Sequence, residues 1–190
     1  YEEIIFETAN SFAFVDPTLA SEHSANRKDM QYYNEAIYCY YLEDYEGAMR
    51  AAKQALKLGS IKASYLLIEL YYDEDSPYRD VEKTISYAKQ LFEATKDPEL
   101  AFLLGLVYDQ QLKDYVKAVN WYENAERLGH KRVAFYLGRI YYYGLLRTKR
   151  DGGKALAYFK KARENGIQEA EGYIKDLEDL KGEDLQTAID

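Results

Sequence analysis

Apolar residues recur along the chain at the spacing of α-helices, and the helices they predict come in four pairs. In each pair a first helical segment is followed by a second one. In three of the four first segments an alanine precedes a leucine by three positions, which places both on one helix face. In three of the four second segments alanines recur seven positions apart, and such small side chains let helices approach closely. The first segments are 32–41, 63–72, 101–110 and 134–143. The second segments are 48–60, 84–96, 118–130 and 155–167.

The second segments are copies of one another at a nearly constant interval. They begin at positions 48, 84, 118 and 155, which are 36, 34 and 37 residues apart. A period in this range is typical of stacked repeat arrays, in which no single unit can bury its own apolar face. The sequence therefore predicts an all-α solenoid of about four antiparallel helix pairs, with capping helices at both ends.

Polar and glycine residues mark where these helices begin and end. An aspartate stands four residues before each second segment, where it can cap the first helical turn: Asp44, Asp80, Asp114 and Asp151. Gly59, Gly129 and Gly166 end three of the segments, as expected for a left-handed residue after a helix. Gly105 and Gly138 lie inside first helices, where we expect close contact with the partner helix.

The two ends of the chain differ from the repeats. Residues 1–28 are expected to form an N-terminal capping or interface segment, because 1–14 is apolar and 18–28 is polar. Residues 29–170 hold the four repeats, and 171–190 are expected to form an acidic capping helix and tail. The chain begins with Tyr1 rather than methionine, so we expect a processed or excised piece.

The third and fourth repeats resemble the Sel-one-like repeat family, a longer-looped relative of tetratricopeptide repeats. The fourth carries the family spacing at Ala134, Leu137, Gly138, Tyr141, Gly144, Asp151, Lys154, Ala155, Tyr158, Ala162 and Gly166. The third carries it at Ala101, Leu104, Gly105, Tyr108, Asp114, Lys117, Ala118, Trp121, Ala125 and Gly129. The first repeat is closer to a plain tetratricopeptide repeat, and the second departs at Leu67 and Thr84. The resemblance implies a right-handed superhelix with a concave binding surface, acting as an adaptor or scaffold.

Tyrosine is unusually frequent, with 21 residues in clusters. Most are expected to pack in the core, but consecutive tyrosines on a helix cannot all face inward, and tyrosine suits interface anchoring. The groove positions of tetratricopeptide-like first helices, carried over by resemblance, give the candidate partner-binding residues. They are Tyr33, Ile37, Tyr40, Ser64, Tyr71, Phe102, Asp109, Phe135, Arg139 and Tyr142. Arg139 is the only cation among them, so no carboxylate clamp is carried over.

Charge is unevenly distributed in a chain whose net charge is −8. Residues 127–163 hold eleven lysines or arginines against one aspartate, which leaves −18 for the rest. Three interpretations of this block are open. It is a solvated face balanced by the acidic C-terminal helix, or it binds an acidic protein, which could be a second copy of the chain. The third is a site for nucleic acid or anionic lipid, which the negative charge of the remaining chain disfavours. The candidate basic patch is Arg132, Arg147, Lys149, Arg150, Lys154 and Lys161.

Catalytic and metal-binding residues are scarce. The chain has two histidines and one cysteine, with no zinc-ligand spacing and no glycine-rich phosphate loop, so no enzyme activity, cofactor or metal is expected. We expect His130 at the surface beside a helix C-terminus, with ligand contact as the alternative. Cys39 is expected to be a packing residue, with a reactive role as the alternative.

These observations favour a non-enzymatic adaptor that binds another protein or peptide through a tyrosine-lined groove and the basic patch. An inhibitor or immunity-type protein that blocks an enzyme is the first alternative, and a nucleic-acid-associated regulator is the second. No apolar run is long enough to span a membrane. One cysteine slightly favours the cytoplasm, while periplasmic or exported locations stay open.

Overall fold

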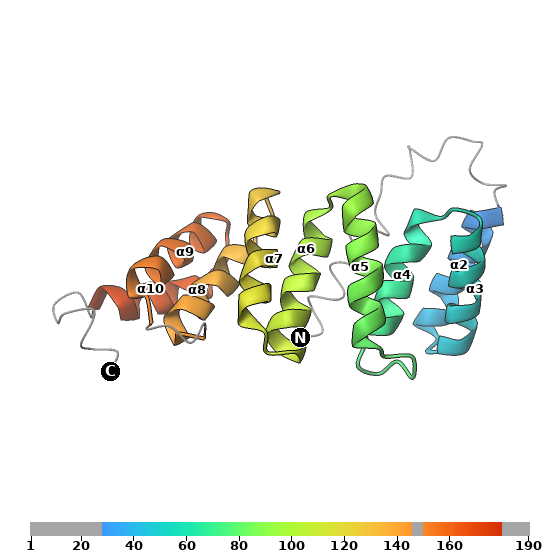
Figure 1. The fold of residues 1–190 in the computed structure, drawn as a ribbon, viewed down its shortest axis with the longest axis horizontal. Coiled ribbons are helices and arrows are strands. Elements are labelled where there is room, and N and C mark those ends of the chain that lie inside the picture. The colour runs from blue at the N-terminus through green and yellow to red at the C-terminus, as the bar shows by residue number, and fades with distance from the viewer. Residues whose placement is uncertain (1–27, 146–149, 180–190) are drawn as a thin grey trace. The chain divides into compact units, whose positions relative to one another are not determined.

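A computed structural model describes residues 28–145 and 150–179 (Figure 1). The expected N-terminal cap and the C-terminal tail lie outside these residues. Within the described ranges the chain is all-α, with no strand, as the helical repeat pattern predicts. The helices are α2 (Lys28–Tyr41), α3 (Tyr45–Lys57), α4 (Ile61–Tyr72), α5 (Val81–Thr95), α6 (Pro98–Leu106), α7 (Tyr115–Arg127), α8 (Val133–Tyr143), α9 (Gly152–Glu164) and α10 (Ala170–Asp179), with a π-helical turn, η2 (Val107–Gln111), after α6.

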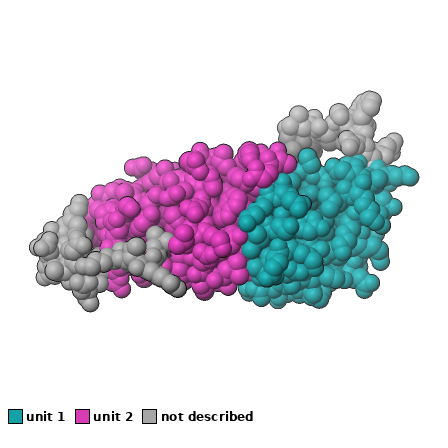
Figure 2. Space-filling view, in the orientation of Figure 1, with its two compact units in different colours: residues 1–91 teal, residues 92–190 magenta. Residues whose placement is uncertain are grey.

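The chain divides into two compact units, residues 1–91 and residues 92–190 (Figure 2). In the first unit α3 packs between α2 and α4, and alanines of α3 meet leucines of α4 in one apolar core. In the second unit the consecutive helices from α6 to α10 pack in order along the chain. The sequential packing of neighbouring helices is what a helical-repeat fold requires.

The four cap aspartates begin the second helices as predicted. Each carboxylate accepts a hydrogen bond from the backbone N–H three residues later, at 2.9 to 3.1 Å. Each aspartate also donates its own N–H to a carbonyl near the end of the preceding helix, at 2.8 to 3.1 Å. One short side chain therefore starts the second helix and ties it to the first.

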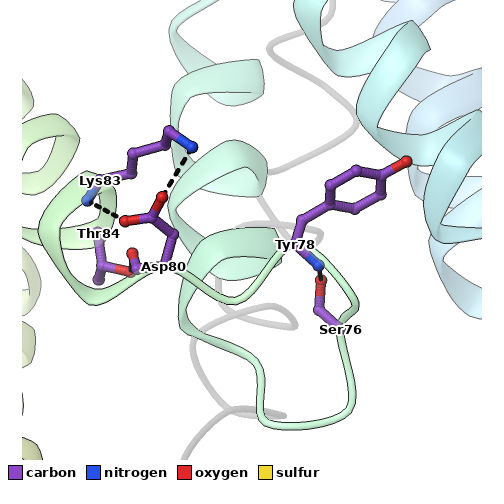
Figure 3. A network of polar contacts seen from close by, with 5 residues as sticks. All are labelled: Ser76, Tyr78, Asp80, Lys83 and Thr84. Atoms are coloured by element: carbon purple, nitrogen blue, oxygen red, sulfur yellow. Dashed lines mark hydrogen bonds and ion pairs between the residues drawn. The ribbon is translucent and has the colours of Figure 1, made fainter.

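In three repeats the cap belongs to a recurring set of tyrosine, aspartate and lysine. The lysine lies three residues after the aspartate, pairs with its carboxylate and extends over the tyrosine ring of the preceding helix. Figure 3 shows this contact at Asp80 and Lys83, where the carboxylate and ammonium are 2.7 Å apart. The sets are Tyr71–Asp80–Lys83, Tyr108–Asp114–Lys117 and Tyr141–Asp151–Lys154, with ammonium-to-ring distances of 5.2, 5.4 and 4.9 Å.

The first repeat replaces that set with smaller residues. Asp44 still caps α3, but Cys39 takes the place of the tyrosine and Gly47 that of the lysine. A side chain at Gly47 would collide with the Asp44 carboxylate and approach the Cys39 sulfur to 2.9 Å. Burial and the neighbouring Asp44 carboxylate raise the pKa of the Cys39 thiol, which makes it less reactive.

The glycine predictions are confirmed. Gly59, Gly129 and Gly166 adopt φ values of 87°, 89° and 90°, the left-handed geometry that ends a helix without a Cβ penalty. Gly105 and Gly138 face aromatic rings of the partner helix: a Cβ on Gly105 would collide with Tyr122, and one on Gly138 would lie 2.8 Å from Phe159. Both rings are fully buried, so these glycines allow the close approach of the paired helices.

Candidate protein-binding site

Within the first unit, the candidate groove residues share one apolar cluster. Tyr33, Ile37 and Tyr40 are half-buried on α2 and pack against a core that includes Tyr71 of α4. Tyr71 itself is only 5% exposed, so it offers almost no surface to a partner. Ser64 on α4 is also half-buried, so four of the five candidates keep an accessible part, and Tyr71 is a packing residue in this structure.

A group of carboxylates beside Tyr40 is the feature that the candidate list missed. Tyr40 Oη donates to Asp73 Oδ2 at 3.0 Å, and Glu69 lies one helical turn before Asp73 on α4. Glu69 Oε1 is shielded from solvent and has no hydrogen-bond partner. Burial, with the nearby Asp73 charge, raises the pKa of Glu69 to about 8, so its carboxyl is protonated at neutral pH.

Within the second unit, aromatic side chains from three helices gather around Phe159. Phe135 and Tyr142 of α8 lie 5.8 and 6.1 Å from the Phe159 ring, and Tyr173 of α10 stacks on that ring at 4.5 Å. Phe135, Tyr142 and Tyr173 are half-buried, whereas Phe159 is fully buried. The cluster thus presents aromatic edges on a rigid base, which is the property that an interface anchor needs.

Phe102 and Asp109, the two candidates of the third repeat, take part in interactions within the second unit. Phe102 is 3% exposed and packs against Tyr122 and Tyr136. Asp109 accepts a hydrogen bond from Tyr122 Oη at 3.1 Å. Burial raises the pKa of Asp109, and the Tyr122 hydrogen bond and the positive charge of Arg139 act against that rise. Arg139, the one cationic candidate, is half-buried on α8.

The surface position predicted for His130 is wrong. Its side chain is 4% exposed, because the imidazole stacks on Phe102 with ring centroids 4.1 Å apart. Nε2 lies 3.3 Å from a Glu99 carboxylate oxygen, while Nδ1 is buried without a hydrogen-bond partner. The stacking residue lies far away in the sequence, so local pattern gave no sign of it.

Part of the basic block is paired inside the second unit. Lys161 Nζ lies 2.8 Å from Glu126, and Lys154 lies 3.9 Å from Asp151. Arg132 is half-buried and Arg150 is exposed, each with an interaction of its own. Of the candidate basic patch, Arg147 and Lys149 fall outside the described residues.

The exposed aromatic residues are mostly different from the candidate ones. Tyr38 and Tyr41 on α2 are 66% and 55% exposed, and Tyr143 at the end of α8 is 45% exposed. The expectation that consecutive tyrosines cannot all be buried is therefore confirmed. Their positions could have been found from helical periodicity, because Tyr38 and Tyr41 lie on the face opposite Ala36 and Tyr143 lies opposite Ala134.

The described parts of the chain hold neither a cluster of metal ligands nor a membrane-spanning helix. In residues 28–145 and 150–179, no group of three or more histidine, cysteine, aspartate or glutamate side chains could hold a metal ion. None of the helices described is long and apolar enough to cross a membrane.

Comparison with known proteins identifies the class that this fold defines, a helical-repeat interaction module. The family model of the Sel1 repeat matches residues 86–130 and 132–167, which run from within α5 to just beyond α9. These two adjacent stretches match the Sel1 repeat, and repeats of that family are generally non-catalytic interaction modules.

A relative in the yeast Candida glabrata is similar over part of this chain. It is named "ERAD-associated E3 ubiquitin-protein ligase component HRD3" and is 31% identical over 100 residues. The aligned stretch covers 50% of this chain and 12% of that relative, so the chain spans only a small part of its length.

Proposed function

We propose that this chain is a non-enzymatic scaffold that holds another protein against the first helices of its repeats. The match of two adjacent repeats to the Sel1 family carries the proposal, because that module generally serves protein interaction. The Candida glabrata relative is by name a component of a ligase, and a role in a multi-protein assembly agrees with a scaffold.

Half-buried side chains are the proposed contact residues. In the first unit these are Tyr33, Ile37 and Tyr40, and in the second unit Phe135, Arg139 and Tyr142. Tyrosine contributes a large contact area with few rotatable bonds, so little conformational entropy is lost when a partner covers it. Arg139 and the basic patch would steer an acidic partner to the second unit, mainly through the association rate.

Affinity capture tests this proposal against the alternatives. The immobilised chain is exposed to an extract of the cells that make it, with and without nuclease treatment, and the bound material is eluted and identified. A scaffold is expected to retain one or a few proteins in fixed stoichiometry after nuclease treatment, and the purified proteins should rebind.

Other outcomes would contradict the scaffold. Recovery of nucleic acid with no protein that survives nuclease treatment would favour the nucleic-acid alternative. A single enzyme whose turnover stops when it is bound would favour an inhibitor. A matched column that carries an unrelated acidic helical protein controls for retention by charge alone.

A further inference from the structure

Four polar side chains of the first unit meet where three helices come together. Asp73 is the C-cap residue of α4, and Glu69 lies four positions earlier, on the same helix face. Tyr40 comes from the last turn of α2 and Tyr45 from the first turn of α3. Their rings pack edge to face, with centroids 6.0 Å apart and planes at 82°. We call Tyr40, Tyr45, Glu69 and Asp73 the carboxylate–tyrosine cluster.

The Asp73 carboxylate is held firmly in place. Its Oδ2 accepts from Tyr40 Oη at 3.0 Å, and its Oδ1 accepts from the backbone N–H of Asp75 at 3.0 Å. The backbone N–H of Asp73 donates to the Glu69 carbonyl at 2.8 Å, which closes the helix end. These hydrogen bonds fix the carboxylate at the C-terminus of α4, the negative end of the helix dipole.

The negative charge of the cluster lies on Asp73, because Glu69 holds a proton at neutral pH. Among the described residues no lysine or arginine forms an ion pair with Glu69 or Asp73. The other charged groups that influence it, Asp75 and Glu43, are also acidic. Glu69 Oε1 is buried with no partner, and an unsatisfied buried polar atom destabilises a protein.

The chemistry of the cluster selects its ligand. A hydrogen-bond donor with a positive charge would pair with Asp73 and lie beside two tyrosine rings, which attract cations, and its charge would favour ionisation of the nearby Glu69 carboxyl. A calcium ion would need six to eight oxygen ligands, and the described residues here hold only two carboxylates within reach of each other. A guanidinium or ammonium group on a flexible stem meets these requirements.

We infer that the carboxylate–tyrosine cluster is a subsite for a cationic side chain, arginine or lysine, of a protein segment bound to the first unit. The inference rests on the proposed scaffold function and adds the chemistry of one contact. The partner segment would therefore carry a basic residue toward α4, while an acidic part of the partner would suit the basic patch of the second unit.

A titration with a small probe tests the subsite without the natural partner. The full ¹⁵N-labelled chain is titrated with acetyl-arginine amide, and with acetyl-citrulline amide, which has nearly the same shape without charge. Amide shifts are expected to concentrate at residues 40–45 and 69–75 with the arginine probe and to be absent with the citrulline probe. Asp73→Asn is expected to weaken binding by about tenfold or more, because a charge-assisted hydrogen bond becomes neutral.

Glu35→Gln, which changes an exposed carboxylate on α2, is the matched control and should bind the probe as the unaltered chain does. Shifts spread over the acidic surface, or equal affinity in Asp73→Asn, would overturn the subsite. If Asp73→Asn fails to fold, Glu69→Gln provides a second test.

Probe affinity of the unaltered chain should rise from pH 6 to pH 9, because the bound cation favours the ionised Glu69 carboxylate. This rise should be smaller in Glu69→Gln. An equal rise in both chains, or none in either, would also overturn it.

The two proposals fail separately. If a captured protein binds Asp73→Asn as tightly as the unaltered chain, the scaffold stands and the subsite is wrong. If no protein is captured, the scaffold is wrong, and the probe titration still reports on the subsite.

Discussion

At the residue scale, Glu69 is a carboxylic acid within the apolar helix α4. The neighbouring residues Leu66, Leu67, Ile68 and Leu70 are buried. Burial raises the pKa of the Glu69 carboxyl to about 8, so the group keeps its proton at neutral pH. The sequence held a sign of this feature, since one glutamate interrupts the run at 63–72. Sequence could not reveal that Tyr40 and Asp73 would share its surroundings, because that depends on how α2 meets α4.

The raised pKa of Glu69 predicts how folding stability depends on pH. Between about pH 4.5 and pH 8 the folded state holds a proton that the unfolded state releases, so stability falls as pH rises through this range. Glu69→Gln cannot ionise and should become progressively more stable than the unaltered chain, by up to about 1.4 kcal/mol per pH unit. Urea unfolding at pH 5, 6.5 and 8 measures the difference. A difference that stays constant over this range would contradict a protonated Glu69.

At the element scale, helix pairing rests on small residues that face aromatic rings. The helix pairs, the cap aspartates and the terminal glycines were predictable from the sequence because each is set by neighbours a few positions away.

The π-helical turn η2 was not predicted, because a pattern of apolar residues cannot distinguish a π-helical turn from continued α-helix. There Leu112 donates to the Val107 carbonyl at 3.1 Å, five residues back. The buried stacking of His130 on Phe102 was missed for the same reason, since it joins different helices.

The close approach of α8 and α9 can be tested at one glycine. Gly138→Ala places a Cβ 2.8 Å from the buried Phe159 ring and should destabilise the fold by about 1–3 kcal/mol through overpacking. Gly172→Ala on α10 is the matched control, because nothing lies within 4 Å of its added Cβ. It should stabilise the fold by about 0.5–1 kcal/mol, as alanine does in a helix. Chemical denaturation followed by circular dichroism checks both, and equal effects would contradict the packing account.

At the scale of the whole molecule, part of the basic block is balanced by acidic residues within the second unit. Lys160 and Arg163 of α9 pair with Glu178 and Glu171 of α10 at 2.8 and 3.4 Å, so the acidic terminal helix balances part of the basic block. Exposed pairs of this kind contribute roughly 0–1 kcal/mol each and weaken with salt. The interpretation as a solvated, balanced face therefore holds for these lysine and arginine residues, and the basic patch stays a proposal. The partner was beyond prediction from the sequence, because a repeat fixes the scaffold and leaves the contact surface free to vary.

The most direct test of the scaffold account is the dissociation constant of the captured, purified partner for three chains. Replacing Tyr142 with alanine removes an aromatic edge from α8, while replacing it with phenylalanine keeps the ring. The account predicts that Tyr142→Ala binds at least about tenfold more weakly, as expected for a tyrosine anchor, and that Tyr142→Phe stays close to the unaltered chain, with helicity preserved in both. Equal dissociation constants for all three folded chains, with the same result for Tyr40→Ala, would contradict it.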